Sequence, residues 1–220
     1  MSGTFIGRPT ARPASMLLTL LRHGDVEGRA QVLRGRSDPV LSAYGQQQLQ
    51  LAIASIEPAI TAVVTSPLQR CHAFAQQYAQ QHNLPLQRSE ELREIDFGDW
   101  EELTLAEAEA HDPAYFTQFK QDTANWCAPH GEAYAAFRER VRTALTIIAS
   151  MKTRHILAIT HGGVMRALIA ELLQLSPASA ARIGVPLAGI CQLWLDEQVP
   201  DEPIQGSLLR LHWLDAPCAT

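Results

Sequence analysis

The sequence has few of the features that mark secreted, membrane or nucleic-acid-binding proteins. Its four cysteines include no C-x-x-C pair, so we expect reduced, structural thiols of a cytoplasmic protein rather than a disulfide framework. No apolar run reaches membrane-spanning length, so we expect a soluble protein without a membrane partner. The net charge of −5 leaves no basic surplus that would favour nucleic acid as a partner.

Metal-ligand spacings and the composition of a disordered chain are also missing. The eight histidines include no pair at the short spacing that structural zinc sites use, so we predict neither a metal nor another cofactor. Charged residues make up 19% and hydrophobic residues 46% of the 220 residues, which suits one compact domain with a full core. The composition leaves the oligomeric state open.

The first fifteen residues differ from the rest of the chain. They contain arginines and prolines but no acidic residue, and they lack the apolar run of a signal peptide. We expect a disordered tail over 1–15, with an organelle transit peptide as the alternative. We expect one domain over 16–214 and a short tail over 215–220.

Short apolar runs alternate with helical patterns along the remaining chain. Residues 16–21, 60–65 and 155–160 are nearly continuous apolar runs, typical of strands that are buried on both faces. Further strands are predicted over 84–90, 190–195 and 207–214, and helices after 42, after 66, near 104, over 115–119, over 132–151, over 164–172 and after 176. Four of the helices have recognisable start signals, which are Ser42, Ser66-Pro67, Thr104 with Glu107, and Ser176-Pro177.

This alternation predicts the fold class. Strands that alternate with helices form an α/β protein, here a three-layer α/β/α sandwich whose mixed sheet is mainly parallel. The irregular segment 95–131 is too long for an ordinary connection, so we expect it to form a small helical lid.

Polar residues follow three of the predicted strands. Arg22 and His23 follow the first, Arg70 lies shortly after the second, and His161 follows the strand over 155–160. The carboxyl ends of parallel strands meet at one edge of the sheet, where α/β proteins bind ligands. Arginine forks match phosphate oxygens, and a neutral imidazole can act as a nucleophile. A second, protonated imidazole can balance the charge on the transferring oxygens.

Each of these features alone has an ordinary explanation. A His-Gly pair after a strand is typical of a turn, Arg70 of a solvated helix residue, and Gly162-Gly163 of a tight entry into a helix. The combination at three strand ends is harder to explain in that way. It predicts a site that holds and transfers a phosphoryl group.

Four motifs resemble those of the histidine phosphatase (phosphoglycerate mutase-like) superfamily, and they occur in that family's order. Residues 21–24 read LRHG, 66–71 read SPLQRC, 92–101 read LREIDFGDWE and 160–163 read THGG. The resemblance covers the region 16–214. Within the superfamily, FGDWE over 97–101 and PHGE over 129–132 are most similar to the α-ribazole phosphatase branch of cobalamin biosynthesis.

The resemblance implies a role for each matched residue. His23 would accept the phosphoryl group, while Arg22, Arg70 and His161 would complete the phosphate pocket. Glu94 would donate a proton to the leaving oxygen. A carboxyl group in a lidded cleft beside a phosphate dianion tends to stay protonated, which suits that role. The alternative for Glu94 is one more surface acid in an acidic stretch.

The loop after His23 departs from the family pattern. The family often continues RHG with Glu-Thr and an Asn a few residues on, whereas this chain has Asp25 and then Arg29. Whether Arg29, Arg34 or Arg36 contacts the substrate is open at this point, and solvated loop side chains are the alternative.

Together the motifs predict a metal-independent phosphomonoesterase that acts through a phosphohistidine on a small metabolite phosphate, with α-ribazole 5′-phosphate as a candidate. The alternatives are a cofactor-dependent phosphoglycerate mutase and a non-catalytic phospho-ligand binder. Over 94–137, Lys120 is the only lysine or arginine, so we expect a single phosphate on a largely uncharged or aromatic body. The aromatic residues available there to stack on such a body are Trp100, Tyr115, Phe116, Phe119 and Trp126.

Overall fold

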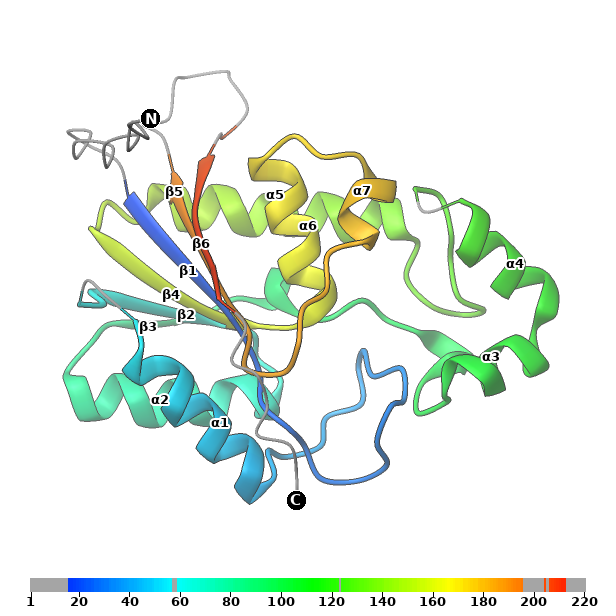
Figure 1. The fold of residues 1–220 in the computed structure, drawn as a ribbon, viewed down its shortest axis with the longest axis horizontal. Helices are drawn as coiled ribbons and strands as arrows, with labels where there is room; N and C mark the ends of the chain where they lie inside the picture. Colours follow the sequence, from blue (N-terminus) through cyan, green and yellow to red (C-terminus); the bar gives the residue numbers. More distant parts are fainter. Residues whose placement is uncertain (1–15, 57–58, 123, 196–203, 205, 213–220) are drawn as a thin grey trace, which may run out of the picture.

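The computed structural model describes residues 16–56, 59–122, 124–195, 204 and 206–212. The tails predicted over 1–15 and 215–220 lie outside the described residues, as do the last two residues of the strand predicted over 207–214. Figure 1 shows the order in which the strands and helices follow one another.

A six-stranded mixed sheet forms the centre of the molecule, with the strand order β3-β2-β4-β1-β5-β6 (Figure 1). β3, β2, β4 and β1 run parallel, and β5 pairs antiparallel with both β1 and β6. The mainly parallel, mixed sheet expected from the sequence is therefore confirmed. The strands are β1 (Met16–Arg22), β2 (Ala62–Thr65), β3 (Leu86–Arg88), β4 (His155–Thr160), β5 (Ile190–Leu195) and β6 (Gly206–His212).

Helices cover both faces of the sheet and complete the three layers. α1 and α2 lie on one face, and α5 and α6 lie on the other (Figure 1). Alternate strand residues divide between the two cores: Leu21 and Val63 pack with α1 and α2, whereas Leu20 and Val64 pack with α5 and α6. Because both faces are covered, the central strands are continuous apolar runs. The helices are α1 (Ala43–Ala54), α2 (Gln69–His82), α3 (Leu105–His111), α4 (Pro113–Gln121), α5 (Tyr134–Ser150), α6 (Gly162–Leu172) and α7 (Pro177–Ala181), with short 3-10 turns η1 (Glu90–Leu92) and η2 (Gly98–Trp100).

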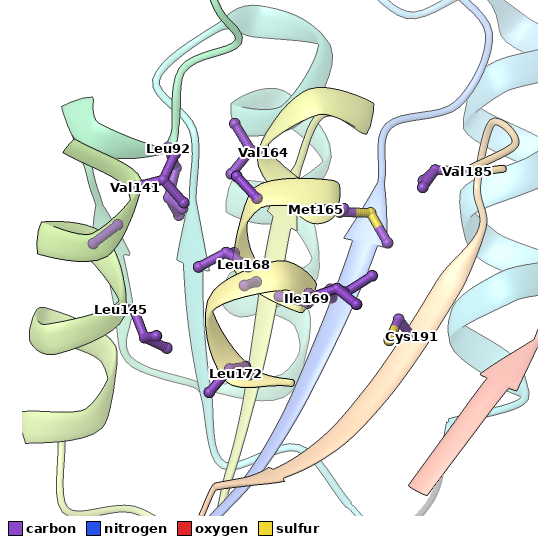
Figure 2. Packing of buried hydrophobic residues seen from close by; sticks show 14 of the residues in the cluster. Leu92, Val141, Leu145, Val164, Met165, Leu168, Ile169, Leu172, Val185 and Cys191 are labelled. Carbon is purple, nitrogen blue, oxygen red and sulfur yellow. The ribbon is translucent and has the colours of Figure 1, made fainter. Parts of the chain in front are cut away.

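Helix α6 packs on the sheet beside α5, and most of its residues are buried. Figure 2 shows Val141 and Leu145 of α5 pointing toward α6, which presents Val164 and Leu168 from its own surface. Their spacing of four residues along each helix is that of a core-facing stripe. α6 begins directly after His161, so this packing fixes where that histidine stands relative to the sheet. Every helix in the described part of the chain is too short or too polar to cross a membrane.

Three of the four predicted helix starts are confirmed. The Ser42 hydroxyl accepts a hydrogen bond from the backbone at the start of α1, and Thr104 with Glu107 forms a capping box at the start of α3. Ser176 caps α7, with Pro177 in its first turn.

The predicted helix start at Ser66-Pro67 is wrong. α2 begins at Gln69, with Leu68 as its N-cap and no side-chain cap. The Ser66 hydroxyl is instead within hydrogen-bond distance of His161 Nε2, at 2.8 Å. A serine that looks like a helix cap in the sequence therefore belongs to the residues at the sheet edge.

The segment 95–131 lies beyond the sheet, beside the loop 24–41 that follows β1 (Figure 1). It contains α3 and α4, so the helices predicted near 104 and over 115–119 are confirmed. The Leu33 N–H donates to the Leu103 carbonyl at 2.7 Å, which joins the loop to the segment. Trp100 is fully buried and packs edge-on against Phe116, so these aromatics supply a small core of the segment's own.

We predict that Leu168→Ala lowers the free energy of unfolding by about 2–5 kcal/mol, because it leaves a cavity between α6, α5 and the sheet. The matched control is Leu51→Ala on α1, whose side chain is 57% exposed. It should change stability by less than about 0.5 kcal/mol. Urea unfolding of both variants measures the difference, and similar losses would contradict this description of the core.

Candidate active site

The strand register brings the predicted site residues to one edge of the sheet. Arg22 lies opposite Thr160 where β1 pairs with β4, so the next residues, His23 and His161, emerge side by side. Their rings meet edge to face with centroids 5.3 Å apart. Arg70, in the first turn of α2, reaches the same edge and contacts His161. We name Arg22, His23, Arg70 and His161 the central cluster.

His23 is held as a single neutral tautomer. Its Nδ1 lies 2.8 Å from the Gly24 carbonyl oxygen. Because a carbonyl only accepts, Nδ1 carries the hydrogen and Nε2 keeps a free lone pair. Burial lowers the pKa of His23 well below its usual value, and the charges of Arg22 and Arg70 add to this effect. The result is an unprotonated ring nitrogen in a positively charged surrounding.

Gly24 is required by the close approach of α1. A Cβ atom at this position would lie 2.2 Å from the backbone oxygen of Gly45. The two glycines therefore let the helix pack directly against the backbone that holds His23. This gives the glycine of the RHG motif a packing role.

His161 is also neutral in this structure, which differs from the protonated imidazole that the sequence led us to expect. Arg70 Nε donates to His161 Nδ1 at 3.2 Å. Nε2 then carries the hydrogen and donates to the Ser66 hydroxyl at 2.8 Å. Burial, together with Arg70 and His23, lowers the pKa of His161 well below its usual value. The positive charge of the central cluster therefore comes from its two arginines.

Arg70 is fully buried and is held by the loop 24–41. Its Nη1 donates to the Ser37 carbonyl at 2.6 Å, and its Nη2 donates to the carbonyls of Gly35 at 2.9 Å and Arg34 at 3.3 Å. A buried guanidinium is tolerated when its donors are paired. Neutral carbonyls meet that need without cancelling the charge, so Arg70 can still attract an anion.

Glu101 organises the same loop from the opposite side. Its carboxylate accepts hydrogen bonds from the backbone N–H groups of Gly35, Arg36 and Ser37 at 2.9–3.1 Å. It also accepts one from the Phe97 N–H at 3.1 Å. Sequence reasoning did not select Glu101 as a functional residue, although it ends the LREIDFGDWE motif.

Arg22 is oriented from the far side of the cluster. Its Nη1 donates to the Val185 carbonyl at 2.5 Å, while its buried Nε has no hydrogen-bond partner among the described residues. Burial lowers the pKa of this guanidinium, Glu94 opposes that effect, and Arg166 and Arg70 add to it. Arg22 thus keeps a donor available at the cluster.

Glu94 lies at the edge of the cluster and is 8% exposed. One carboxyl oxygen accepts from the Gly163 N–H at 2.8 Å and the other from the Ile95 N–H at 3.0 Å. A Cβ atom on Gly163 would lie 2.3 Å from Glu94 Oε1, so only glycine leaves room for this carboxyl group. Arg140 of α5, missed in the sequence, donates to the backbone carbonyls of Arg93 and Glu94 and fixes the segment that carries the carboxyl.

The three arginines of the loop 24–41 pair with acidic residues of the segment 95–131 and with Glu132 directly after it. Their charges join the loop to that segment. Of these pairs, Arg29–Glu107 is exposed on both sides, and an exposed pair of this kind contributes little to stability. The pairs are Arg29 with Glu107 at 2.6 Å, Arg34 with Glu102 at 2.8 Å, and Arg36 with Asp96 and Glu132, each at 3.8 Å.

A cavity of about 570 Å³ adjoins the central cluster at Glu94 and Gly163. We name it the side cavity. The loop 24–41, the segment 95–131 and helices α5, α6 and α7 all contribute to its wall. The wall is mainly apolar and also contains Lys120 and Arg166. Its aromatic residues are Phe97, Phe119, Trp126, Tyr134 and Phe137.

Two of the five aromatic residues expected to stack on a substrate line this cavity, Phe119 and Trp126. Trp100 and Phe116 are buried in the segment's own core, and Tyr115 is 48% exposed. The sequence could not separate these cases, because the fold decides which aromatic rings face the cavity and which pack in the segment's core. Within the described residues, no group of three or more His, Cys, Asp or Glu side chains is placed to hold a metal ion.

The buried neutral histidines predict how stability depends on pH. The pKa values of His23 and His161 are lowered in the folded state, whereas both titrate near pH ~6.5 when unfolded. As the pH falls through that value, the unfolded chain binds protons that the folded chain does not. The free energy of unfolding should therefore decrease, by at most about 1.4 kcal/mol per pH unit for each histidine, and His161→Gln should reduce this slope.

Urea unfolding between pH 8 and pH 5.5 (about one unit below the usual histidine pKa) measures the slope. The control is His111→Gln, because a hydrogen bond to Asp112 raises the pKa of that exposed histidine. Removal of His111 should not reduce the slope. An unchanged slope in His161→Gln would contradict the neutral, buried state of His161.

Comparison with known proteins agrees with the motifs. The sequence model of the histidine phosphatase superfamily (branch 1) matches residues 18–201. The chain is 33% identical over 193 residues to the bifunctional protein Rv2228c of Mycobacterium tuberculosis (strain ATCC 25618 / H37Rv). That match covers 86% of this chain and 53% of the relative, so the chain spans about half the length of that protein.

A second relative and a solved structure are similar over most of both chains. The adenosylcobalamin/alpha-ribazole phosphatase of Escherichia coli (strain K12) is 29% identical over 168 residues, which is 75% of this chain and 82% of the relative. The native structure of mycobacterial glucosyl-3-phosphoglycerate phosphatase superimposes with a TM-score of 0.74 at 27% identity, covering 88% of this chain and 97% of that one. By the family match and by its fold, this chain belongs to branch 1 of the histidine phosphatase superfamily.

Proposed function

We propose that this protein is a metal-independent phosphomonoesterase that acts through a phosphohistidine at His23 on a small metabolite phosphate. One observation carries the proposal. The Nδ1–H of His23 is engaged by the Gly24 carbonyl, so Nε2 has a free lone pair beside two arginines. A neutral, oriented imidazole beside fixed positive charge is what a phosphoryl acceptor requires.

In the first step, His23 Nε2 attacks the phosphorus atom and the bond from phosphorus to the leaving oxygen breaks. Glu94 gives its proton to that oxygen, and the substrate departs as an alcohol. Arg22 and Arg70 bind the three equatorial oxygens of the transferring group. His161 donates its Nε2 hydrogen to one of these oxygens.

In the second step, water attacks the phosphorus of the phosphohistidine. The Glu94 carboxylate, left by the first step, takes a proton from that water, and the bond from phosphorus to Nε2 breaks. Inorganic phosphate leaves and His23 returns to its starting tautomer. The two arginines supply the positive charge throughout, so the proposal needs no metal ion.

We propose that the segment 95–131 is the lid of the site and that the side cavity receives the leaving group. Its apolar, aromatic wall, including Phe119 and Trp126, supports an aromatic body. α-Ribazole 5′-phosphate is a candidate of that kind, suggested by the name of the Escherichia coli relative. The free thiols of Cys71, Cys127 and Cys191 support a reducing compartment such as the cytoplasm.

His23→Ala should lower kcat by at least about 10⁴-fold on para-nitrophenyl phosphate in EDTA, because it removes the group that forms the bond to phosphorus. A radiolabelled, acid-labile phosphoenzyme should be trapped from the wild type and not from the variant. The matched control is His130→Ala, which removes a histidine that is 85% exposed and pairs with Asp99. Substantial activity in His23→Ala, or activity that needs an added divalent metal, would refute the mechanism.

Glu94→Gln should slow alkyl phosphates by about 10²–10⁴-fold and para-nitrophenyl phosphate far less, because a good leaving group needs no proton. The ratio of kcat/KM values for the two substrate classes is the measurement. Glu90→Gln, which changes an exposed carboxylate nearby, serves as the control. Equal slowing of both classes would favour a structural role for Glu94.

Substrate assays separate the phosphatase from the two alternatives. A phosphoglycerate mutase would isomerise 3-phosphoglycerate, whereas the proposed enzyme would release inorganic phosphate. A phospho-ligand binder would do neither and would leave para-nitrophenyl phosphate intact.

A further inference from the structure

Arg166 is a cation of the side cavity that the proposed reaction does not use. It lies in α6, one turn after Gly163, and lines the cavity together with Glu94. Its charge contributes to the lowered pKa of Arg22, whose first cause is burial, so the two guanidinium groups are near each other. Arg166 therefore stands on the leaving-group side of the central cluster.

The guanidinium of Arg166 is only partly engaged. Its Nε donates to the Ile183 carbonyl at 2.9 Å, and its terminal nitrogens have no hydrogen bond or ion pair among the described residues. Other arginines nearby are paired: Arg138 and Arg142 with Glu171, and Arg140 with Glu132. A planar fork that is fixed at Nε and open at its two ends is suited to a bidentate anion.

The charges that line the cavity indicate what kind of anion would fit. They come from Arg166, Lys120 and Glu94. Lys120 pairs with Glu109 at 2.8 Å, and the two oxygens of Glu94 accept hydrogen bonds from the Gly163 and Ile95 N–H groups. Arg166 is therefore the lining cation without an ion pair among the described residues, and a single guanidinium fork matches a carboxylate better than the dianion of a second phosphate. The charge count over 94–137 did not include Arg166, because it comes from a different part of the chain.

We propose that Arg166 is a specificity residue that binds a carboxylate on the leaving group, so that the preferred substrates are phosphate esters of apolar or aromatic alcohols bearing a carboxylate. This inference rests on the proposed phosphatase function and narrows its substrate class. An uncharged aromatic body such as that of α-ribazole 5′-phosphate fits the apolar wall but leaves Arg166 without a partner. Arg166 acts on binding and orientation, and takes no part in breaking the ester bond.

The test compares two substrates that differ in one charge: carboxyphenyl phosphate and carbamoylphenyl phosphate, each as the meta and the para isomer. The two isomers place the carboxylate at two distances from the phosphate. The wild type should prefer the carboxylate over the amide by about ten- to hundredfold in kcat/KM for at least one isomer. Arg166→Gln should bring that ratio close to one, and Arg166→Lys should keep part of the preference, since it retains the charge without the fork.

Arg142→Gln is the matched control, because it removes an arginine that is 48% exposed and pairs with Glu171 outside the cavity. It should leave the ratio at the wild-type value. Equal slowing of the carboxylate and the amide in Arg166→Gln would assign Arg166 a structural role through its bond to Ile183 and would overturn the inference. Equal rates for both substrates in the wild type would overturn it while the phosphatase function stands. A wild type that releases no phosphate from either substrate would overturn both.

Discussion

The whole site depends on the short loop 34–37. A carboxylate binds the N–H groups of this loop, and a guanidinium binds its carbonyl groups. The Glu101 carboxylate accepts hydrogen bonds from the N–H groups of Gly35, Arg36 and Ser37. The Arg70 guanidinium donates hydrogen bonds to carbonyl groups of the same loop. Both side chains would be costly to bury unpaired. The peptide groups between them satisfy both without bringing the charges into direct contact. Arg70 therefore stays buried, rigid and positively charged.

This arrangement explains why the two histidines are neutral. Burial lowers both pKa values first, and the two arginines beside the imidazoles lower them further because they make a third cation unfavourable. For His23 that state is useful, since an unprotonated Nε2 is the nucleophilic form. For His161 it means that the ring is a hydrogen-bond donor in the structure as it stands. Preorganised arginines, rather than a charged imidazole, then supply most of the attraction for phosphate oxygens.

Local sequence patterns predicted the sheet, its two helical layers and the edge where the site lies. They succeeded because central strands buried on both faces are apolar throughout, and because parallel strands end at one edge. Ser66 was misassigned as a helix cap, since a Ser-Pro pair after a strand has the same local signature whether the helix starts there or later.

The partners that complete the site could not be predicted from local patterns. Glu101 contacts residues about 65 positions earlier in the chain, and Arg140 contacts carbonyls about 47 positions earlier. No spacing rule connects positions so far apart; the fold alone brings them together. The same is true of Arg166, which looks like an ordinary helix arginine in the sequence. Its place in the side cavity follows from how α6 packs on the sheet beside α5.

The most direct test of this account is the position of the phosphoryl group on the trapped phosphoenzyme. Phosphorus-31 NMR of the isolated phosphopeptide distinguishes phosphate on Nε2 of histidine from phosphate on Nδ1. Because the Gly24 carbonyl holds the Nδ1 hydrogen, the account predicts that phosphate is attached to Nε2 of His23. Phosphate on Nδ1, on another residue, or on no residue at all during turnover would contradict it.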